Sequence, residues 1–201
     1  MTSIIPSPSK MTDNYSNLQF RIATPDDAPQ LQQLVQSAFC AHDTRPDWTG
    51  HLELASNFRI EVDEIMTNIT DPDMVILIAF TPLNENGNSG NNNDKDIVAS
   101  ISVSKRGTDV GRLSMFAVNE RYQRGGVGRQ VLAYAEDYCH RTWGVEKFSL
   151  NTLSTRKALI EWYMRRGYRK TGETSPFPRE RFKDLELPDD MCFVEFEKDL
   201  R

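Results

Sequence analysis

The sequence predicts a mixed α/β or α+β fold built around one central sheet. Short apolar runs of strand length cluster in the middle of the chain, at 74–80, 97–105 and 112–118. Segments with apolar residues at helical spacing lie on both sides of this cluster. Helices that alternate with a run of central strands bury their apolar faces against a shared sheet, which is why we expect one layered domain.

The first predicted helix has a clear start. Leu18 to Ala23 alternates like a strand, and Thr24 and Pro25 follow it directly. Thr is a favoured N-cap and Pro is favoured in the first turn. The later elements are predicted from periodicity and from turn residues such as Gly167, which is expected to cap a helix at its C-terminal end. The strands expected are 18–23, 74–80, 97–105, 112–118, 147–153, 168–171 and 191–198, and the helices are 24–40, one or two within 51–68, 127–141 and 155–166.

The chain is predicted to be one domain over residues 18–201, with a disordered tail at 1–17. That tail is rich in Ser, Thr, Pro and Asn. Residues 84–96 read NENGNSGNNNDKD and lie between two strand-like runs, so we expect a flexible hairpin loop there. No internal repeat is found in the sequence.

Composition narrows the classes of partner. The net charge is −5 over 201 residues, which argues against nucleic acid as a partner. No apolar run approaches the ~20 residues of a membrane helix, and no secretory signal is recognised, so we expect no membrane partner. The three cysteines are far apart and odd in number, which favours free thiols in a cytoplasmic, reducing compartment. No His or Cys spacing suggests a metal site.

The most informative stretch is Gln123–Arg124–Gly125–Gly126–Val127–Gly128. It follows the apolar run at 112–118 and precedes a helical pattern. Glycines let the backbone turn tightly and let a ligand approach it. The helix that follows would point amide N–H groups and the positive end of its dipole at the turn. This arrangement is typical of phosphate binding.

Three local matches make the chain resemble the GNAT superfamily of acyl-CoA-dependent N-acyltransferases. The first is the signature (Gln or Arg)-x-x-Gly-x-(Gly or Ala), present as Gln123, Gly126 and Gly128 after the strand at 114–118. The second is the strand 148–151, which ends in Asn151, and the third is the stretch 158–168. The resemblance implies a central mixed, mostly antiparallel sheet of six to seven strands flanked by about four helices.

The resemblance also implies acetyl-CoA as co-substrate. The turn and helix start would bind its diphosphate, and Arg124 and Arg129 would add charge-assisted contacts. Backbone groups of the strand before the turn would hydrogen-bond the pantetheine amides, which requires that strand to part from its neighbour. The cofactor-binding residues implied are Phe116, Ala117, Val118, Gln123, Arg124, Gly125, Gly126, Val127, Gly128, Arg129, Asn151 and Tyr163.

Tyr163 and Asn151 are the catalytic candidates that the resemblance implies. Tyr163 matches the position of a general acid that protonates the departing thiolate; a phenol of pKa ~10 and a thiol of pKa ~8.5 make that transfer feasible. Alternatively, Tyr163 packs in the core or only orients the cofactor. Asn151 would hold the pantetheine arm or a water. Cys139 and Cys192 lack a partner that would activate a thiol, so direct transfer to the acceptor is expected.

The general base is not identified by the sequence. An amine with pKa ~10.4 is neutral in only about one molecule per thousand at pH ~7.4, which costs about 4 kcal/mol. Some family members carry Glu on the strand before the turn, but here Arg112 occupies that place and the strand holds no Asp, Glu or His. The base is absent, replaced by water, or supplied from elsewhere. Glu120, just beyond the strand, is read as a solvated turn residue.

The acceptor is expected to be an amine, with a small molecule favoured over a protein. The resemblance implies an acceptor side at 42–58 and 174–190, where Asp47, Trp48 and Phe177 are the candidate acceptor-binding residues. At 47–48, an aromatic plate beside an acid suits a cationic amine. Trp48 could instead anchor two helices. Two alternatives stay open: a non-catalytic acyl-CoA-binding module, and an acetyltransferase of protein lysines or N-termini. The chain is expected to be a monomer or a homodimer.

Overall fold

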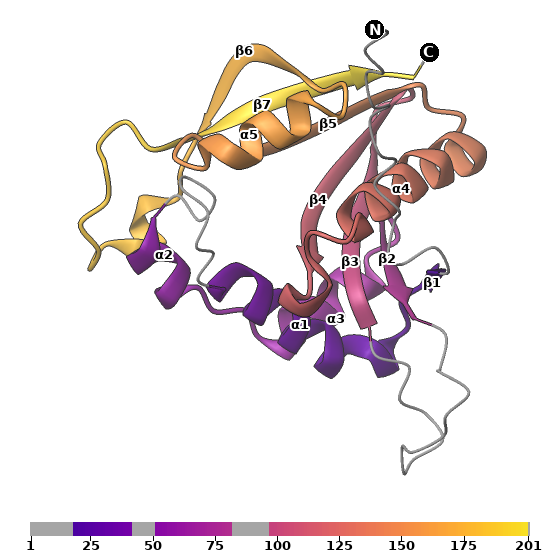
Figure 1. Ribbon diagram of the computed structural model, residues 1–201, viewed down its shortest axis with the longest axis horizontal. Helices are drawn as coiled ribbons and strands as arrows, with labels where there is room; N and C mark the ends of the chain where they lie inside the picture. The colour runs from indigo at the N-terminus through magenta and orange to yellow at the C-terminus, as the bar shows by residue number, and fades with distance from the viewer. Residues whose placement is uncertain (1–17, 42–50, 82–96, 201) are drawn as a thin grey trace, which may run out of the picture.

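One sheet of seven strands organises the protein (Figure 1). The computed structural model describes residues 18–41, 51–81 and 97–200. The expected tail at 1–17 and the expected loop at 84–96 lie outside the described residues. The strands are β1 (Gln19–Ile22), β2 (Met74–Phe80), β3 (Ile97–Arg106), β4 (Val110–Val118), β5 (Lys147–Leu153), β6 (Arg169–Pro176) and β7 (Cys192–Asp199).

The sheet has the order β1-β2-β3-β4-β5-β7-β6. Its neighbours pair antiparallel except β4 and β5, which are parallel. A parallel pair needs a crossover connection, and here α4 supplies it between β4 and β5. The expectation of a mixed, mostly antiparallel sheet of six to seven strands is therefore confirmed.

Helices cover both faces of the sheet. The described residues contain five α-helices, where about four were expected: α1 (Ala28–Cys40), α2 (Leu52–Asn57), α3 (Val62–Thr70), α4 (Val127–Trp143) and α5 (Lys157–Met164). α4 and α5 share a core with one face, whereas α1 and α3 share a second core with the opposite face. The extra helix arises because the region 51–70 holds two helices separated by an extended stretch.

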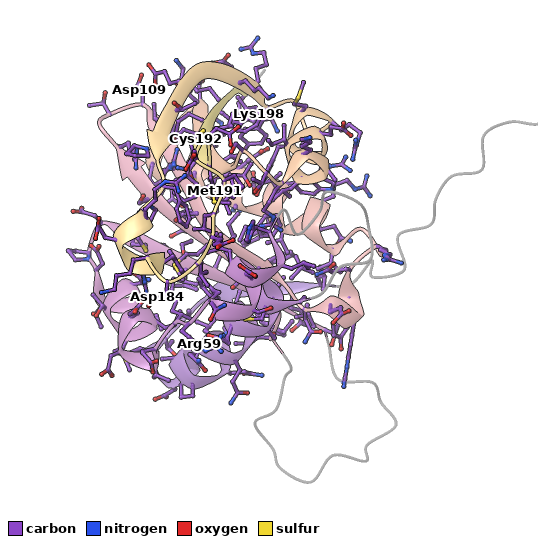
Figure 2. The ribbon with its side chains drawn as sticks, turned by 90° about the vertical axis from the view of Figure 1, so that its left-hand side faces the viewer. Arg59, Asp109, Asp184, Met191, Cys192 and Lys198 are labelled. Carbon is purple, nitrogen blue, oxygen red and sulfur yellow. The ribbon has the colours of Figure 1, made fainter. Side chains whose placement is uncertain are left out.

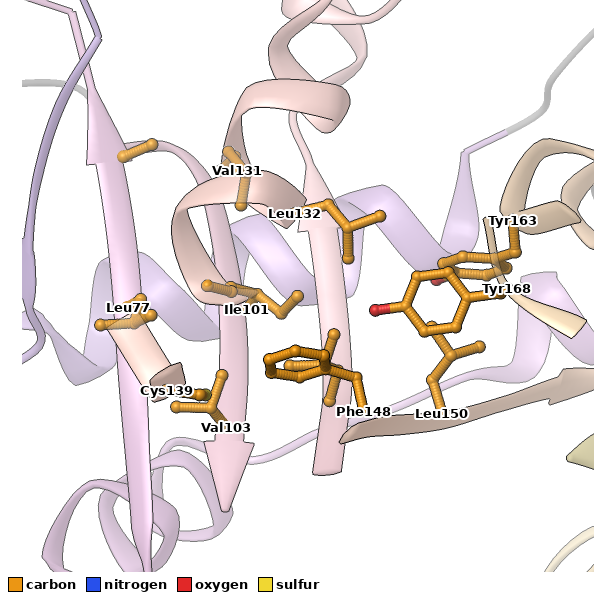
Figure 3. Close-up of a cluster of buried hydrophobic side chains, with 14 of the residues drawn as sticks. Leu77, Ile101, Val103, Val131, Leu132, Cys139, Phe148, Leu150, Tyr163 and Tyr168 are labelled. Atoms are coloured by element: carbon orange, nitrogen blue, oxygen red, sulfur yellow. The ribbon is translucent and has the colours of Figure 1, made fainter. Parts of the chain in front are cut away.

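The larger core joins α4 and α5 to the middle of the sheet (Figure 3). The helical spacing expected for α4 is confirmed, since Val127, Val131 and Ala135 are buried there. β5 contributes Phe148 and Leu150 from alternate positions. Burial of this apolar area stabilises the fold at roughly 25 cal/mol per Å². Because successive side chains of a strand point to opposite faces, the residues of β5 between these two face the other side of the sheet, where the candidate site lies.

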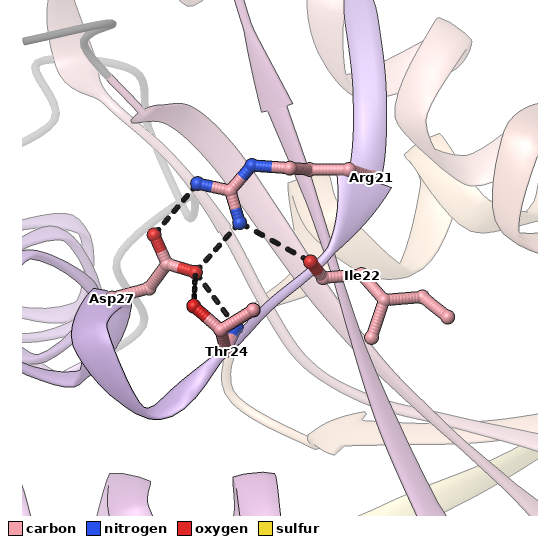
Figure 4. Close-up of polar contacts among 4 residues, drawn as sticks. All are labelled: Arg21, Ile22, Thr24 and Asp27. Atoms are coloured by element: carbon pink, nitrogen blue, oxygen red, sulfur yellow. Dashed lines mark hydrogen bonds and ion pairs between the residues drawn. The ribbon is translucent and has the colours of Figure 1, made fainter. Parts of the chain in front are cut away.

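A polar cluster fixes the entry to α1 (Figure 4). Asp27 accepts two bonds from the Arg21 guanidinium, at 2.6 and 2.7 Å, and bonds from the Thr24 amide and hydroxyl at 2.7 and 3.0 Å. The short helix η1 (Pro25–Asp27) precedes α1, so the predicted Thr–Pro start is confirmed. The carboxylate satisfies donors that a helix start would otherwise leave unpaired.

A smaller core lies where α2 meets the last part of the chain. Leu54, Phe177 and Met191 are buried together. Their segment contains the short helix η3 (Arg179–Phe182) and returns to β7 at Cys192; Met191 and Cys192 are labelled in Figure 2. Strand β6 reaches Pro176, beyond the end expected at 171, because the edge strand keeps pairing with β7 after an irregularity between Lys170 and Thr174.

Candidate active site

Strands β4 and β5 separate after three paired positions. Val110, Gly111 and Arg112 pair with Lys147, Phe148 and Ser149, and the pairing stops there. Figure 1 shows the two strands diverging beyond this point. We call the region between β4 residues 113–118 and β5 residues 150–153 the splay. Along it each strand presents backbone groups that the other does not pair, and an extended ligand can use such groups by strand addition.

A bulge reshapes β4 along the splay. Ser114 pairs with Ser102 and Ala117 with Ser100, so Ile101 of β3 faces two residues of β4. Met115 adopts φ 45°, which is unusual for a residue with a side chain. After the bulge Phe116 and Val118 contact the core under α4, whereas Ala117 is buried in the core shared with α1. Bulges commonly redirect side chains near functional sites.

The glycine turn leads directly into α4. Arg124 and Gly126 have φ 67° and 84°, and α4 begins at Val127. The first helical bond joins the Gln130 amide to the Gly126 carbonyl, so the amides of Val127 and Gly128 precede the helical ladder. These amides and the helix dipole suit an anion. The Gln123 side chain donates to the Val118 carbonyl at 3.2 Å, which ties the turn to the end of β4.

Gly128 lies against three apolar side chains. A Cβ built on Gly128 would be 3.6 Å from both Phe116 and Trp162, and 3.8 Å from Val118. These residues come from α4, β4 and α5. The fold therefore brings the predicted turn, the predicted strand and the predicted helix together at the start of α4. The cluster joins two of the three local motifs on which the family resemblance was based, the turn with its preceding strand and the stretch 158–168.

Tyr163 is buried at the edge of the larger core (Figure 3). Its ring contacts Trp162, Tyr168 and Phe196 at centroid distances of 5.2, 5.9 and 6.2 Å. Burial raises the pKa of Tyr163 to about 12, and the positive charge of Arg156 offsets only part of that effect. The phenol therefore stays protonated through the physiological range and is a weaker acid than an exposed tyrosine.

Asn151 belongs to a four-strand polar network, defined here as Arg112, Asn151, Ser175 and Glu195. Glu195 of β7 accepts a bond from Arg112 at 2.7 Å on one oxygen. Its other oxygen accepts from Asn151 at 2.9 Å and from Ser175 at 2.8 Å. The four residues come from β4, β5, β6 and β7. They lie on the sheet face opposite α4 and α5, since their neighbours Phe148, Leu150 and Phe196 belong to the core under those helices.

Glu195 is the site residue that the sequence reasoning missed. Burial disfavours its charged form, but the hydrogen bonds from Arg112, Asn151 and Ser175 together outweigh that effect and lower the pKa of Glu195. Arg112 is 7% exposed and pairs with this carboxylate. The signal in the sequence was the alternation of Val194, Glu195 and Phe196, which placed an acid on the polar face of a strand. The partner strand could not be read from that pattern.

Of the three predicted acceptor residues, the structure describes only Phe177. Asp47 and Trp48 lie outside the described residues. Phe177 is 8% exposed, and its ring contacts Phe182 and Phe193 at 5.3 and 5.8 Å. Glu120 lies exposed at the start of the short helix η2 (Glu120–Tyr122), as expected of a turn residue.

Two hollows on the described surface lie away from the predicted site residues. One is bordered by Asp109 and Lys147, the other by Arg59 and Asp184; Arg59, Asp109 and Asp184 are labelled in Figure 2. Neither hollow contains a residue of the glycine turn or of the polar network. The candidate site is therefore defined by the splay and the glycine turn, and neither hollow forms part of it.

Cys139 is a buried thiol in the core under α4. Burial raises the pKa of the Cys139 thiol to about 12, with the charge of Glu136 adding to the effect, so this thiol is a poor nucleophile. Within residues 18–41, 51–81 and 97–200, no three His, Cys, Asp or Glu side chains are grouped as metal ligands. No helix among these residues has the length and apolar character to cross a membrane.

The fold and the turn at the start of α4 are those of an acyltransferase, and comparison with known proteins identifies the family. A model of the acetyltransferase (GNAT) family matches residues 52–168, more than half of the 201 residues. The chain belongs to this family. Its members use acetyl-CoA, which is consistent with the turn and splay described above. No curated protein sequence matches the chain.

Solved structures of the family share the whole architecture at low sequence identity. The ribosomal-protein-S18-alanine N-acetyltransferase from Escherichia coli is 16% identical, with TM-score 0.61, over 91% of this chain and 94% of that one. The PaiA N-acetyltransferase from Thermoplasma acidophilum in complex with coenzyme A is 14% identical, with TM-score 0.59, over 91% and 99%. Arabidopsis thaliana NAA60 in complex with a bisubstrate analogue is 13% identical, with TM-score 0.62, over 92% and 100%.

Proposed function

We propose that this protein transfers the acetyl group of acetyl-CoA directly to the amine of a small molecule, within a ternary complex. The observation that carries the proposal is the splay beside the glycine turn. It combines unpaired β4 backbone with the amides of Val127 and Gly128 at the start of a 17-residue helix. Extended amide-containing ligands and diphosphates are the chemistry that these two features suit.

The residues present fit acetyl-CoA. The turn residues Gln123, Arg124, Gly125, Gly126, Val127, Gly128 and Arg129 would surround the diphosphate, and Phe116, Ala117 and Val118 would offer backbone groups to the pantetheine arm. Acetyl-CoA supplies an acetyl thioester with a good leaving group. An amide N–H of β4 near the splay would polarise the thioester carbonyl, because donors fixed in place stabilise developing negative charge.

Tyr163 would act as the general acid. The neutral acceptor nitrogen would attack the acetyl carbonyl, the carbon–sulfur bond would break, and the departing thiolate would take the proton of the Tyr163 hydroxyl. The proton that the nitrogen loses as the amide forms would return to the phenolate through water, which restores the hydroxyl. No described residue hydrogen-bonds that hydroxyl, so it is not committed to another acceptor within the described chain. Tyr163 is buried against Trp162, which itself borders Gly128. Trp162 also contacts Phe116 of β4 at a centroid distance of 6.1 Å. The acid would therefore be held close to the strand proposed to bind the pantetheine arm, which carries the thioester at its end.

An amine screen tests this function. The protein is incubated with acetyl-CoA and polyamines, arylamines, amino acids, aminoglycosides or peptides, and free thiol and acetylated product are measured. We expect turnover with at least one small amine and a rise in melting temperature with acetyl-CoA alone. Turnover with peptides only would overturn the small-molecule acceptor. Cofactor binding without turnover on any amine would favour a non-catalytic acyl-CoA-binding module.

A further inference from the structure

The orientation of the Asn151 amide is determined by Glu195. The Asn151 side-chain nitrogen donates to Glu195 at 2.9 Å. A flipped amide would place its oxygen against a carboxylate that has no proton to give, so the observed orientation is the favoured one. Glu195 is fixed in turn by Arg112 and Ser175. The network therefore holds one particular atom of Asn151, its nitrogen, toward β7.

The Asn151 oxygen is left as a hydrogen-bond acceptor. Among the described residues none donates to it. Strand β5 has β7 on one side and β4 on the other. The amide nitrogen and oxygen of Asn151 point in different directions from the same carbon. Because the nitrogen points to Glu195 on β7, the oxygen points away from β7. Pairing with β4 has already ended at Ser149, two residues earlier, so Asn151 stands beside the splay.

A second polar group on this face of β5 also lacks a partner. Ser149 lies two residues before Asn151, on the same face of the strand. Its hydroxyl is buried and has no hydrogen bond within the described residues. Buried polar groups are usually paired, so an unpaired one is informative. Two unpaired oxygen atoms along one face of β5, next to the splay, indicate a place where a ligand with N–H donors would bind.

We propose that Glu195 is a positioning residue that orients Asn151, so that the Asn151 oxygen accepts a hydrogen bond from the N–H of the acceptor amine. This inference rests on the proposed acetyl transfer and specifies how the acceptor is held. Glu195 does not need to remove a proton in this role. Three hydrogen-bond donors stabilise the ionised form of Glu195. The carboxylate is therefore a weak base toward the ammonium group of an acceptor.

The face of the sheet favours the acceptor over the cofactor as the partner of Asn151. Gly128, Phe116 and Trp162 meet on the side of α4 and α5. The polar network lies on the opposite side, toward α1 and α2. A thioester in the splay would be reached from one side by the cofactor-binding elements and from the other by the acceptor. Asn151 is on that second side.

The test is a double-mutant cycle on acceptor KM. Spermidine, tyramine and a peptide with N-terminal alanine are assayed, and the fastest acceptor of the unaltered protein is used. Glu195→Gln removes the charge that fixes the network, and Asn151→Ala removes the acceptor oxygen. We expect each change to raise acceptor KM about tenfold, as loss of one hydrogen bond predicts. The double variant should be no worse than Asn151→Ala alone, while the Kd of acetyl-CoA changes less than about twofold.

Two controls separate orientation from stability. Glu197→Gln changes the next acid on the same face of β7, which pairs with Lys147 at 3.9 Å on the surface, and should leave acceptor KM unchanged. Arg112→Met with Glu195→Met removes the ion pair without leaving a lone buried charge, so it should fold and still raise acceptor KM. Additive effects in the cycle, or a changed Kd for acetyl-CoA with unchanged acceptor KM, would overturn the inference. Absence of turnover by the unaltered protein would overturn the proposed function first.

Discussion

Burial determines what Tyr163 can contribute. A phenol with pKa about 12 is a weaker acid than a thiol of pKa ~8.5. Its proton would therefore move as the carbon–sulfur bond breaks, when the sulfur becomes most basic. The same burial keeps the phenol protonated at pH values where an exposed tyrosine, with pKa ~10, would already ionise. Burial therefore gives a proton donor that is protonated at every physiological pH but is a weak acid.

Tyr163→Phe should lower kcat about a hundredfold or more while the Kd of acetyl-CoA changes less than about threefold. General acids typically contribute at least ~100-fold, and phenylalanine keeps the ring contacts with Trp162 and Tyr168. The measurements are steady-state kinetics and calorimetric titration. Because the phenol titrates near 12, the pH–rate profile of the unaltered protein should show no fall from Tyr163 up to pH ~10.

A matched tyrosine supplies the control for this substitution. Tyr134 is in the middle of α4 and stacks at 4.0 Å on Phe20 of β1, the strand at the opposite edge of the sheet from β6. Tyr134→Phe should leave kcat within about twofold. Equal turnover of Tyr163→Phe and the unaltered protein would remove the acid role and leave Tyr163 as a packing residue.

Glu136 is a buried acid that the proposed chemistry does not use. It accepts from the Tyr168 hydroxyl at 2.8 Å and pairs with Lys198 at 2.6 Å. Burial, with the charge and hydrogen bond of Glu136, raises the pKa of Tyr168, so this phenol serves only as a donor to the acid. The three residues join α4 to the start of β6 and to β7. Their role is to hold α4 against the edge of the sheet formed by β7 and β6.

Lys198→Met should lower the free energy of unfolding by about 3 kcal/mol, because it leaves Glu136 as an uncompensated buried charge. Lys147→Met is the matched change on the exposed pair with Glu197, whose side chains are 41% and 47% exposed, and should cost less than about 1 kcal/mol. Urea denaturation of both variants measures the difference. Equal losses would mean that the Glu136 pair contributes no more than a surface pair.

At the scale of elements, α4 begins and ends at glycines with positive φ. Gly126 precedes its first residue with φ 84°, and Gly144 follows its last with φ 67°. An L residue is strained at both places, at about 1–2 kcal/mol each. The two ends differ in function, because only the N-terminal end has amides available to a phosphate. Gly144 can therefore serve as the control position for a substitution at Gly126.

Gly126→Glu should abolish the rise in melting temperature caused by acetyl-CoA, whereas Gly144→Glu should preserve it. Both variants should lose stability by a similar amount, since both place a side chain at positive φ. Only the first adds a negative charge where the diphosphate is proposed to bind. Thermal melts with and without millimolar acetyl-CoA measure this. A retained shift in Gly126→Glu would remove the diphosphate role from the turn.

Elements with strong local signals were predictable from sequence. Strands 74–80 and 147–153 have the predicted bounds, because their apolar patterns end at turn residues. The predicted start of the first helix was also found, since Thr24, Pro25 and Asp27 form a local cap. β6 was predicted too short, because its exposed residues give no apolar pattern and only pairing with β7 extends it.

At the scale of the whole molecule, the polar network shows what sequence reasoning could not supply. Arg112 and Glu195 are 83 positions apart in the sequence and meet because only β5 lies between β4 and β7 in the sheet. The sequence motifs predicted the proposed cofactor side of the site, because its turn, strand and helix are close in sequence. The proposed acceptor side depends on strand order, which local sequence patterns do not determine. The acid that pairs with Arg112 of β4 comes from β7, and in the role proposed above it orients Asn151 and removes no proton.

Two carboxylates, Asp27 in the local cap of the first helix and Glu195 in the network across four strands, predict how stability depends on pH. The hydrogen bond from Arg21 is the main cause that lowers the pKa of Asp27. For Glu195, burial is outweighed by the bonds from Arg112, Asn151 and Ser175, so its pKa is also lowered. A lowered folded pKa stabilises the fold fully above the unfolded value, and this contribution is lost as pH falls through the folded value.

The free energy of unfolding should therefore be constant near neutral pH with respect to these two groups. It should fall as the pH drops below their ordinary values of 3.8 and 4.5. Asp27→Asn should be less stable than the unaltered protein at pH ~7, and the difference should narrow at pH ~3, because protonation removes the same interaction. Urea denaturation across pH measures both. Asp137→Asn, which changes an acid 56% exposed in a surface pair with Arg141, controls for net charge. A difference between Asp27→Asn and the unaltered protein that stayed constant down to pH ~2 would contradict the linkage, since it would show that the Arg21 contact does not depend on ionised Asp27.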